Sequence, residues 1–140
     1  MRTILISGAS SGIGLNIAHK ELKAGNRISL GIRNLESLKG SLIDPNNWPN
    51  EKILINKYDA LDKFSAKEWV ENTVSKFGGF DTLINCSGVL SKVPFLYKDG
   101  DEDDILNTFN INFLAIWNLC RLSWEQLSQS NNGRIIVLVS

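Results

Sequence analysis

The feature that most constrains the fold of this chain is a regular alternation of short apolar segments with stretches that can form helices. The apolar segments are rich in β-branched residues and lie at Thr3–Ser7, Arg27–Ile32, Lys52–Lys57, Asp81–Asn85 and Arg134–Val139. Strands that are apolar along their whole length and separated by helices are typical of a parallel sheet covered on both faces. Because parallel connections are right-handed, the pattern predicts an α/β fold with a doubly wound sheet and three layers, α/β/α.

Three stretches with the apolar spacing of helices separate these strands. They run from Gly12 to Ala24, from Asp62 to Phe77 and, as one long helix, from Asp101 to about Gln129. Their predicted apolar stripes are Ile13, Ile17, Ala18 and Leu22 in the first, Phe64, Trp69, Val70, Val74 and Phe77 in the second, and Ile105, Phe109, Phe113, Ile116, Cys120 and Leu127 in the third. Trp117 and Trp124 are predicted to be packing residues. The segment Asn34–Asn50 is less regular and is predicted to contain a loop.

The length and the charge of the chain exclude several classes of protein. A chain of 140 residues argues for one domain. The 15 lysines and arginines balance 15 acidic residues without a basic block, which argues against nucleic acid or a membrane as partner. The N-terminal apolar run is too short for a secretory signal or a membrane span. Two cysteines and one histidine form no metal motif, so we expect a cytoplasmic protein without a metal site.

A glycine-rich segment joins the first predicted strand to the first predicted helix. It reads Ser7-Gly8-Ala9-Ser10-Ser11-Gly12-Ile13-Gly14. Glycines here let the backbone turn tightly and approach a pyrophosphate, and the N–H groups at the start of a helix attract that anion. Since the segment follows the first strand of an α/β pattern and opens a helix, it predicts a dinucleotide site. The expected cofactor contacts are Gly8, Ser10, Ser11, Gly12, Ile13 and Gly14.

The end of the second predicted strand indicates which dinucleotide is bound. An acidic residue there would bind the ribose 2′-hydroxyl of NAD and repel the 2′-phosphate of NADP. The position holds Ile32, and Arg33 follows it. Arginine can form a paired, charge-assisted contact with a phosphate, so the residues favour NADP over NAD, with Arg33 as a cofactor contact. The alternative interpretation is a solvated arginine at a strand end.

The spacing Gly8-x-x-x-Gly12-x-Gly14 after Ser7 resembles the short-chain dehydrogenase/reductase family. Further segments are similar to that family in the same order, namely Asp59 after the third strand, Asn85-Cys86-Ser87-Gly88 after the fourth, Asn112 in the long helix, and Gly133–Ser140 in the fifth strand. The resemblance implies a Rossmann-type sheet with strand order 3-2-1-4-5. It also implies cofactor contacts from Asp59, Asn85, Ser87 and Gly88, and catalytic roles for Asn112 and Ser140. Ser7, Cys86 and Ser87 stand where the family usually has Thr, Asn and Ala.

The resemblance further implies an oxidoreductase that transfers a hydride between nicotinamide and a small-molecule carbonyl or secondary alcohol. In the family, the Tyr of a Tyr-x-x-x-Lys motif beyond the catalytic Ser is the general acid/base. Neither Tyr58 nor Tyr97 is followed by Lys at that spacing. We therefore expect residues 1–140 to be a single NAD(P)-binding domain, truncated at its C-terminal end and inactive alone. In the full-length form, helix 101–129 is expected to form a homo-oligomer, with Trp117 and Trp124 as alternative interface residues.

Two other functions are weighed against this one. The chain would be a non-catalytic module that binds NADP for structure or sensing, or half of a protein completed by a partner chain that supplies Tyr and Lys. Size-exclusion chromatography separates these alternatives, because a finished module should be compact and a fragment should aggregate or need its partner. The substrate is indicated only as partly hydrophobic, from Val93, Phe95 and Leu96 beside the expected pocket.

Overall fold

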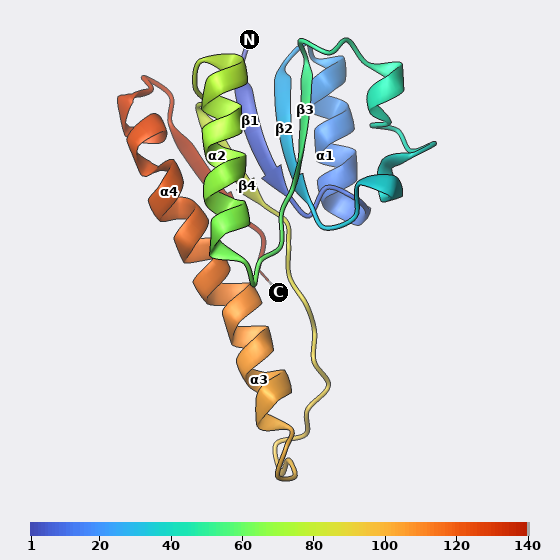
Figure 1. The fold of residues 1–140 in the computed structure, drawn as a ribbon, viewed down its shortest axis with the longest axis vertical. Coiled ribbons are helices and arrows are strands. Elements are labelled where there is room, and N and C mark those ends of the chain that lie inside the picture. The colour runs from blue at the N-terminus through green and yellow to red at the C-terminus, as the bar shows by residue number, and fades with distance from the viewer. Residues whose placement is uncertain (140) are drawn as a thin grey trace.

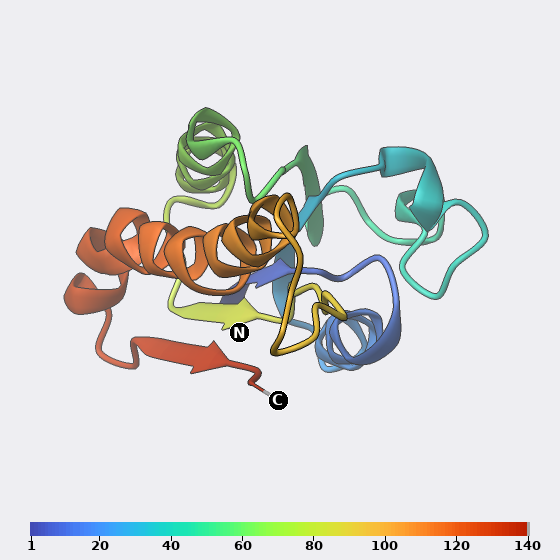
Figure 2. The same ribbon diagram turned by 90° about the horizontal axis from the view of Figure 1, so that it is seen from below.

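The computed structural model describes residues 1–139, which form a five-stranded parallel sheet with the order β3-β2-β1-β4-β5. The strands are β1 (Thr3–Ser7), β2 (Arg27–Ile32), β3 (Ile53–Lys57), β4 (Thr82–Asn85) and β5 (Arg134–Val137). Helix α1 (Gly12–Lys23) covers one face, while α2 (Lys63–Phe77) and α4 (Ala115–Gln129) cover the other, as Figures 1 and 2 show. The predicted fold class, layers and strand order are confirmed.

The sheet separates two apolar cores, which explains why the inner strands are apolar along their whole length. Successive side chains of a strand point to opposite faces. Ile4 and Ile6 accordingly pack on the α1 side, whereas Leu5 between them packs with Trp69 on the α2 side. All five residues of β1 are buried. At the edge of the sheet β5 is different, since Ile135 and Ile136 keep 40% and 44% of their surface exposed.

The helix ends follow from local sequence. Asp62 caps α2 by accepting a hydrogen bond from the N–H of Phe64 at 2.9 Å. The same helix ends at Gly78, whose φ of 78° places it in the left-handed region that favours glycine. Between β2 and β3 the predicted loop contains two short 3₁₀ turns, Leu35–Leu38 and Pro45–Asn47. Leu38 and Ile43 of this segment are buried in the core on the α1 side of the sheet.

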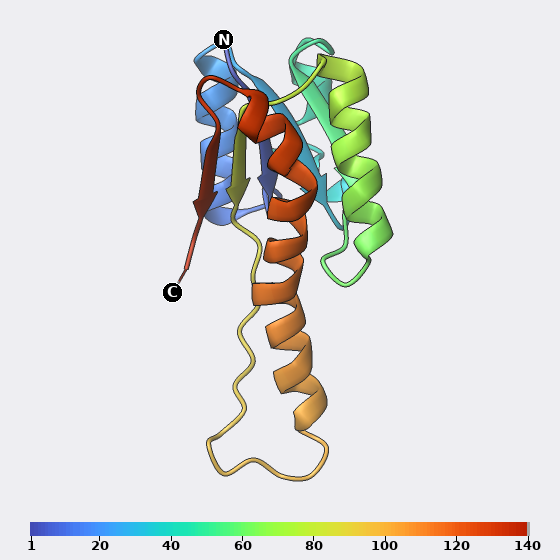
Figure 3. The same ribbon diagram turned by 90° about the vertical axis from the view of Figure 1, so that its left-hand side faces the viewer.

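The predicted long helix is a rod of three consecutive parts. Helix α3 (Glu102–Phe109) is followed by a π-helical turn, Asn110–Leu114, and then by α4. Figure 3 shows that α4 lies against the sheet while α3 extends beyond it, alongside the loop that follows β4. Acidic residues occupy the first turn of α3, where their negative charge interacts favourably with the positive end of the helix dipole. No helix within residues 1–139 has the length and apolarity needed to cross a membrane.

The predicted apolar stripe of the long helix is wrong in its first half. Phe109 at the end of α3 and Phe113 in the π-helical turn are 50% and 48% exposed, and α3 itself projects past the sheet. A π-helical turn holds one more residue than an α-helical turn, so it rotates the face that follows. The buried residues of α4 are Ala115, Leu119, Ser123 and Leu127.

Four predicted packing residues on the three helices are exposed instead. Ile13 and Phe64 lie in the first turns of α1 and α2 and are 64% and 73% exposed. Trp117 and Trp124 lie on the side of α4 opposite its buried residues and are 62% and 64% exposed. Their packing role within residues 1–139 is therefore wrong, and their role in an interface stays a prediction.

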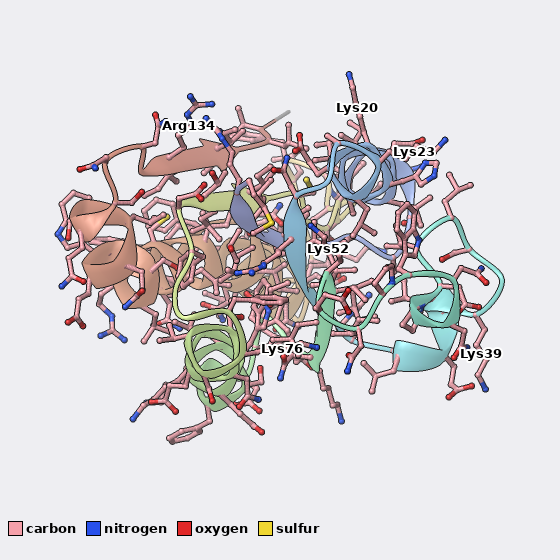
Figure 4. All side chains as sticks on the ribbon, turned by 90° about the horizontal axis from the view of Figure 1, so that it is seen from above. Lys20, Lys23, Lys39, Lys52, Lys76 and Arg134 are labelled. Carbon is pink, nitrogen blue, oxygen red and sulfur yellow. The ribbon has the colours of Figure 1, made fainter. Side chains whose placement is uncertain are left out.

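Several basic residues lie at the amino end of the sheet, among them Lys20, Lys23, Lys52 and Lys76, which Figure 4 labels. Lys52 Nζ donates to the carbonyl of Gly25 at 2.7 Å, and Lys76 Nζ donates to the carbonyl of Ile53 at 3.0 Å. Lys20 and Lys23 lie in the last turn of α1, where cations stabilise the negative end of the helix dipole. These cations therefore serve the helix ends and backbone at this side of the sheet.

A buried hydroxyl in α4 provides a test of the packing. Ser123 Oγ is buried against the sheet and has no hydrogen-bond partner among the described residues. An unpaired buried hydroxyl costs about 1–3 kcal/mol of desolvation. We expect Ser123→Ala to raise the free energy of unfolding by about 1 kcal/mol, measured by urea titration.

The matched control is Ser29→Ala in β2. Ser29 Oγ is equally buried, but it accepts from Trp69 Nε1 at 2.9 Å and bonds Thr73 Oγ1 at 2.7 Å. This substitution should lower the free energy of unfolding by about 1–3 kcal/mol. A loss of stability in Ser123→Ala would show that Ser123 has a partner in solution.

Candidate functional site

Loops at the carboxyl ends of the strands line a groove of about 360 Å³. Figure 2 views the molecule from this end, where the strand order reverses between β1 and β4. Ligands of doubly wound sheets bind at such a point. The groove brings together the predicted contacts Gly8, Ser10, Ser11, Arg33, Asp59, Ser87 and Gly88. A larger cleft of about 580 Å³ lies between the start of α2 and the π-helical turn, and none of the predicted site residues lines it.

The glycine-rich loop leaves no space for side chains at two of its glycines. Gly8 has a φ of 69°, and a Cβ atom there would lie 2.7 Å from the carbonyl carbon of Cys86. A Cβ atom on Gly14 would lie 2.5 Å from the carbonyl oxygen of Gly8. The loop is therefore held tightly between the end of β4 and the first turn of α1.

The start of α1 is free to receive an anion. Ser11 stands at the N-cap of the helix but its side chain makes no capping hydrogen bond, and the first turn holds no acidic residue. The first N–H groups of a helix have no partner inside the helix, and they attract phosphate. Together with Gly8, which lines the groove, this arrangement fits the pyrophosphate of a dinucleotide.

Three polar side chains form a cluster under the glycine-rich loop and join the ends of β1 and β4. Ser7 Oγ donates to Asn85 Oδ1 at 2.6 Å and lies 2.8 Å from Ser87 Oγ. Asn85 Nδ2 donates to the carbonyl of Ser87 at 3.2 Å. Ser7 and Asn85 are fully buried, and Ser87 is half-buried at the groove. We call these residues the Ser7–Asn85–Ser87 cluster.

The residues after β2 and β3 form the other end of the groove. Ile32 is buried, whereas Arg33 is exposed, and no carboxylate of residues 1–139 lies within ion-pair distance of its guanidinium. Asp59 Oδ1 accepts a hydrogen bond from the N–H of Leu61 at 2.9 Å, which orients its carboxylate. Arg33 therefore offers free positive charge at the position where the strand end distinguishes the two dinucleotides.

Tyr58 lines the same groove, but its phenol is unsuited to proton transfer near neutral pH. Burial, and then the charge of Asp59, raise the pKa of Tyr58 to about 12. Its ring packs against Trp69, with the two centroids 5.2 Å apart. Tyr58 is thus a neutral wall of the groove.

Asn112 connects the π-helical turn to the loop after β4. Its Oδ1 accepts from the N–H of Val89 at 2.8 Å, and its Nδ2 donates to the carbonyl of Val89 at 2.8 Å. The amide thereby pairs with both backbone groups of one residue, as a neighbouring strand would. A Cβ atom on Gly88 would lie 3.3 Å from Asn112 Oδ1, so the end of the groove packs closely on this amide.

The remaining predicted site residues lie beside the groove or outside the described residues. Gly12, Ile13 and Gly14 form the first turn of α1, and Asn85 lies beneath the groove in the Ser7–Asn85–Ser87 cluster. Ser140 lies outside residues 1–139. Sequence reasoning missed Ser7 as a supporting residue, although its place at the end of β1, directly before Gly8, was a usable signal. It also missed Ser37 and Tyr58, which line the groove together with Cys86.

The two cysteines allow a test of the groove's position. Burial raises the pKa of both the Cys86 and the Cys120 thiol, and only the thiolate is nucleophilic. Cys86 lines the groove, whereas Cys120 lies on α4 against the core on the other face of the sheet.

Both thiols should react slowly with iodoacetamide at pH 7 and faster as pH rises. NADPH should slow the alkylation of Cys86 and leave that of Cys120 unchanged, measured by mass spectrometry. Equal effects on both cysteines would place the ligand elsewhere.

The doubly wound sheet, the glycine-rich loop and the groove at the switch point define a nucleotide-binding α/β domain. The chain belongs to the short chain dehydrogenase family, whose model matches residues 2–140. The agropine synthesis reductase of Rhizobium rhizogenes is 34% identical over 133 residues, which cover 95% of this chain and 30% of that protein. The 11-beta-hydroxysteroid dehydrogenase A of Sesamum indicum is 30% identical over 139 residues, 99% of this chain and 39% of that protein.

Solved structures of the family share the fold. A short-chain dehydrogenase/reductase described as a glucose/ribitol dehydrogenase from Brucella melitensis has a TM-score of 0.85 and 29% identity, with 99% of this chain and 56% of that chain covered. A short-chain dehydrogenase from Streptomyces avermitilis has a TM-score of 0.88 and 22% identity, covering 99% and 49%, a likeness of fold. The chain spans less than two thirds of each of these relatives, so the activity of a protein of their length is a proposal.

Proposed function

We propose that the full-length protein is an NADP-dependent oxidoreductase that moves a hydride between the nicotinamide and a carbonyl or secondary alcohol. The observation that carries the proposal is the groove itself. It joins a glycine-rich loop at an uncapped helix start to Arg33, in a chain that belongs to the short chain dehydrogenase family. The relatives are named for reductase and dehydrogenase reactions, which supports the reaction class.

The choice of NADP rests on Arg33 and Ile32. Arg33 lines the groove, and its guanidinium has no carboxylate partner among the described residues, so a 2′-phosphate would supply the anionic partner that it lacks. Because Ile32 is apolar and buried, the strand end offers no acceptor for the 2′-hydroxyl of NAD. Asp59 stands close by in the groove, where the family resemblance assigns contact with adenine.

At the other end of the groove, the chain's own residues would position the reacting groups. When bound, the nicotinamide cofactor supplies or accepts the hydride. Asn112 holds Val89 and Gly88 in place, and so shapes the loop beside the substrate. By resemblance, Ser140 would hydrogen-bond the substrate oxygen and stabilise the charge that develops on it.

We also propose that the protein is cytoplasmic and forms a homo-oligomer through the long helix. Phe109, Phe113 and Trp117 form a continuous exposed aromatic row, with ring centroids 5.0 Å and 5.7 Å apart. Apolar patches of this kind are typical of interaction surfaces. Replacing Trp117 by Glu should shift the full chain to a smaller species in sedimentation, and an unchanged mass would contradict this interface.

Binding and turnover together test the proposed function. Calorimetry on the full chain should give a smaller Kd for NADPH than for NADH, and NADPH should be consumed with a panel of aldehydes and ketones. Binding without any turnover would favour a non-catalytic NADP-binding module. Absence of binding by either dinucleotide would contradict the proposal.

A further inference from the structure

The Ser7–Asn85–Ser87 cluster has a hydrogen-bond pattern that determines what Ser87 offers to the groove. The amide of Asn85 has a definite orientation, because its Nδ2 lies 3.2 Å from the carbonyl of Ser87, which can only accept. Its Oδ1 consequently faces the two hydroxyls, at 2.6 Å from Ser7 Oγ and 3.2 Å from Ser87 Oγ.

Counting protons settles the direction of each bond. The shortest contact, at 2.6 Å, takes the single proton of Ser7 to Asn85 Oδ1. Ser7 Oγ then has no proton left for Ser87 Oγ, which lies 2.8 Å away, and can only accept from it. The contact is therefore favourable only when Ser87 is the donor. The single proton of Ser87 therefore stays within the cluster, on Ser7 Oγ or Asn85 Oδ1.

Ser87 lines the groove, and it follows that its Oγ has only lone pairs to offer to a ligand there. A phosphate oxygen or a carbonyl would be repelled there, since both are acceptors. A hydroxyl or N–H donor of the ligand would be bound. Ser87 replaces the alanine usual in the family, so this acceptor is a feature of this chain.

We propose that Ser87 is a specificity-determining residue that accepts a hydrogen bond from a ribose hydroxyl of the bound dinucleotide. The inference rests on the proposed function. Ser87 lies against the loop that would hold the pyrophosphate, because its backbone N is only 2.7 Å from where a Cβ of Gly8 would stand. The groups joined directly to a pyrophosphate in a dinucleotide are its two riboses, which carry hydroxyl donors. Ser7 and Asn85 are positioning residues that keep the proton of Ser87 turned away.

The test compares Ser87→Ala with the unmodified full chain by calorimetry. The probes are NADPH and adenosine 2′,5′-bisphosphate, which contains only the adenosine ribose. Loss of one neutral hydrogen bond should raise the Kd for NADPH by about 3- to 10-fold. An equal rise for both probes would place the donor on the adenosine ribose, and a rise for NADPH alone would place it on the nicotinamide ribose. Either result supports the proposal.

A matched control separates binding from stability. Ser29→Ala removes another buried, hydrogen-bonded serine hydroxyl, on a residue that does not line the groove. It should lower the melting temperature without changing the Kd for NADPH. If Ser87→Ala also lowers only the melting temperature, the hydroxyl is structural and the inference is overturned. If the unmodified chain binds neither NADPH nor NADH, the proposed function itself fails.

Discussion

Gly8→Ala is expected to abolish NADPH binding and to destabilise the fold. Gly8 adopts a φ of 69°, which costs an alanine about 1–2 kcal/mol. Its new Cβ would lie 2.7 Å from both the carbonyl carbon of Cys86 and the N of Ser87, which are backbone atoms at the end of β4. Overpacking of this kind costs about 1–3 kcal/mol more. Urea unfolding should show the combined loss, and calorimetry should show no binding of NADPH.

Gly25→Ala is the matched control for this substitution. Gly25 follows the end of α1 with a φ of 85°, and a Cβ atom there would meet nothing within 4 Å. The variant should therefore lose only the conformational term of about 1–2 kcal/mol and keep the Kd for NADPH. If Gly8→Ala loses no more stability than Gly25→Ala and still binds NADPH, the close packing of the loop on β4 is not required for the site.

The parallel, doubly wound sheet could be predicted from the sequence because each inner strand is buried on both faces, whereas the strand order followed from the family resemblance. In β1, Ile4 and Leu5 are neighbours in sequence that pack in different cores. The strand therefore has no polar face and does not alternate between apolar and polar residues. Such strands occur in parallel sheets, and right-handed connections leave few arrangements. The glycine-rich loop could also be predicted, since the sequence itself shows its place between a strand and a helix.

The long helix could not be predicted in detail, because the spacing of its apolar residues does not show whether another element covers them. The stripe through Ile105, Phe109 and Phe113 is regular, yet α3 extends past the sheet and leaves Phe109 and Phe113 half exposed. The π-helical turn at Asn110–Leu114 then changes the face that α4 buries. The projection has no local sequence signal.

The floor of the site was only partly predictable for a related reason. Asn85 and Ser87 were expected to contact cofactor, and the structure joins them to Ser7 across 78 and 80 residues of sequence. This contact exists because β1 and β4 are neighbours in the sheet with Ser7 opposite Asn85. The parallel pairing was predicted, whereas the register that brings the three side chains together is seen only in the structure.

Arg33→Glu is expected to reverse the preference between the two dinucleotides. The substitution removes a charge-assisted contact to the 2′-phosphate and places a like charge beside it. It also supplies an acid near the strand end, where a carboxylate binds the 2′-hydroxyl of NAD. The Kd for NADPH should rise by at least about 100-fold while that for NADH falls or stays the same, measured by calorimetry at low salt.

Lys57→Glu provides the control because it makes the same change of charge at the end of the neighbouring strand β3. Lys57 is exposed and does not line the groove. Its effect on NADPH should be the small, long-range one of surface charge, and it should disappear as salt screens the interaction. The loss in Arg33→Glu should persist in salt, because direct contact is screened far less. Equal losses in the two variants would mean that Arg33 acts through general charge, and the choice of NADP would then need another residue.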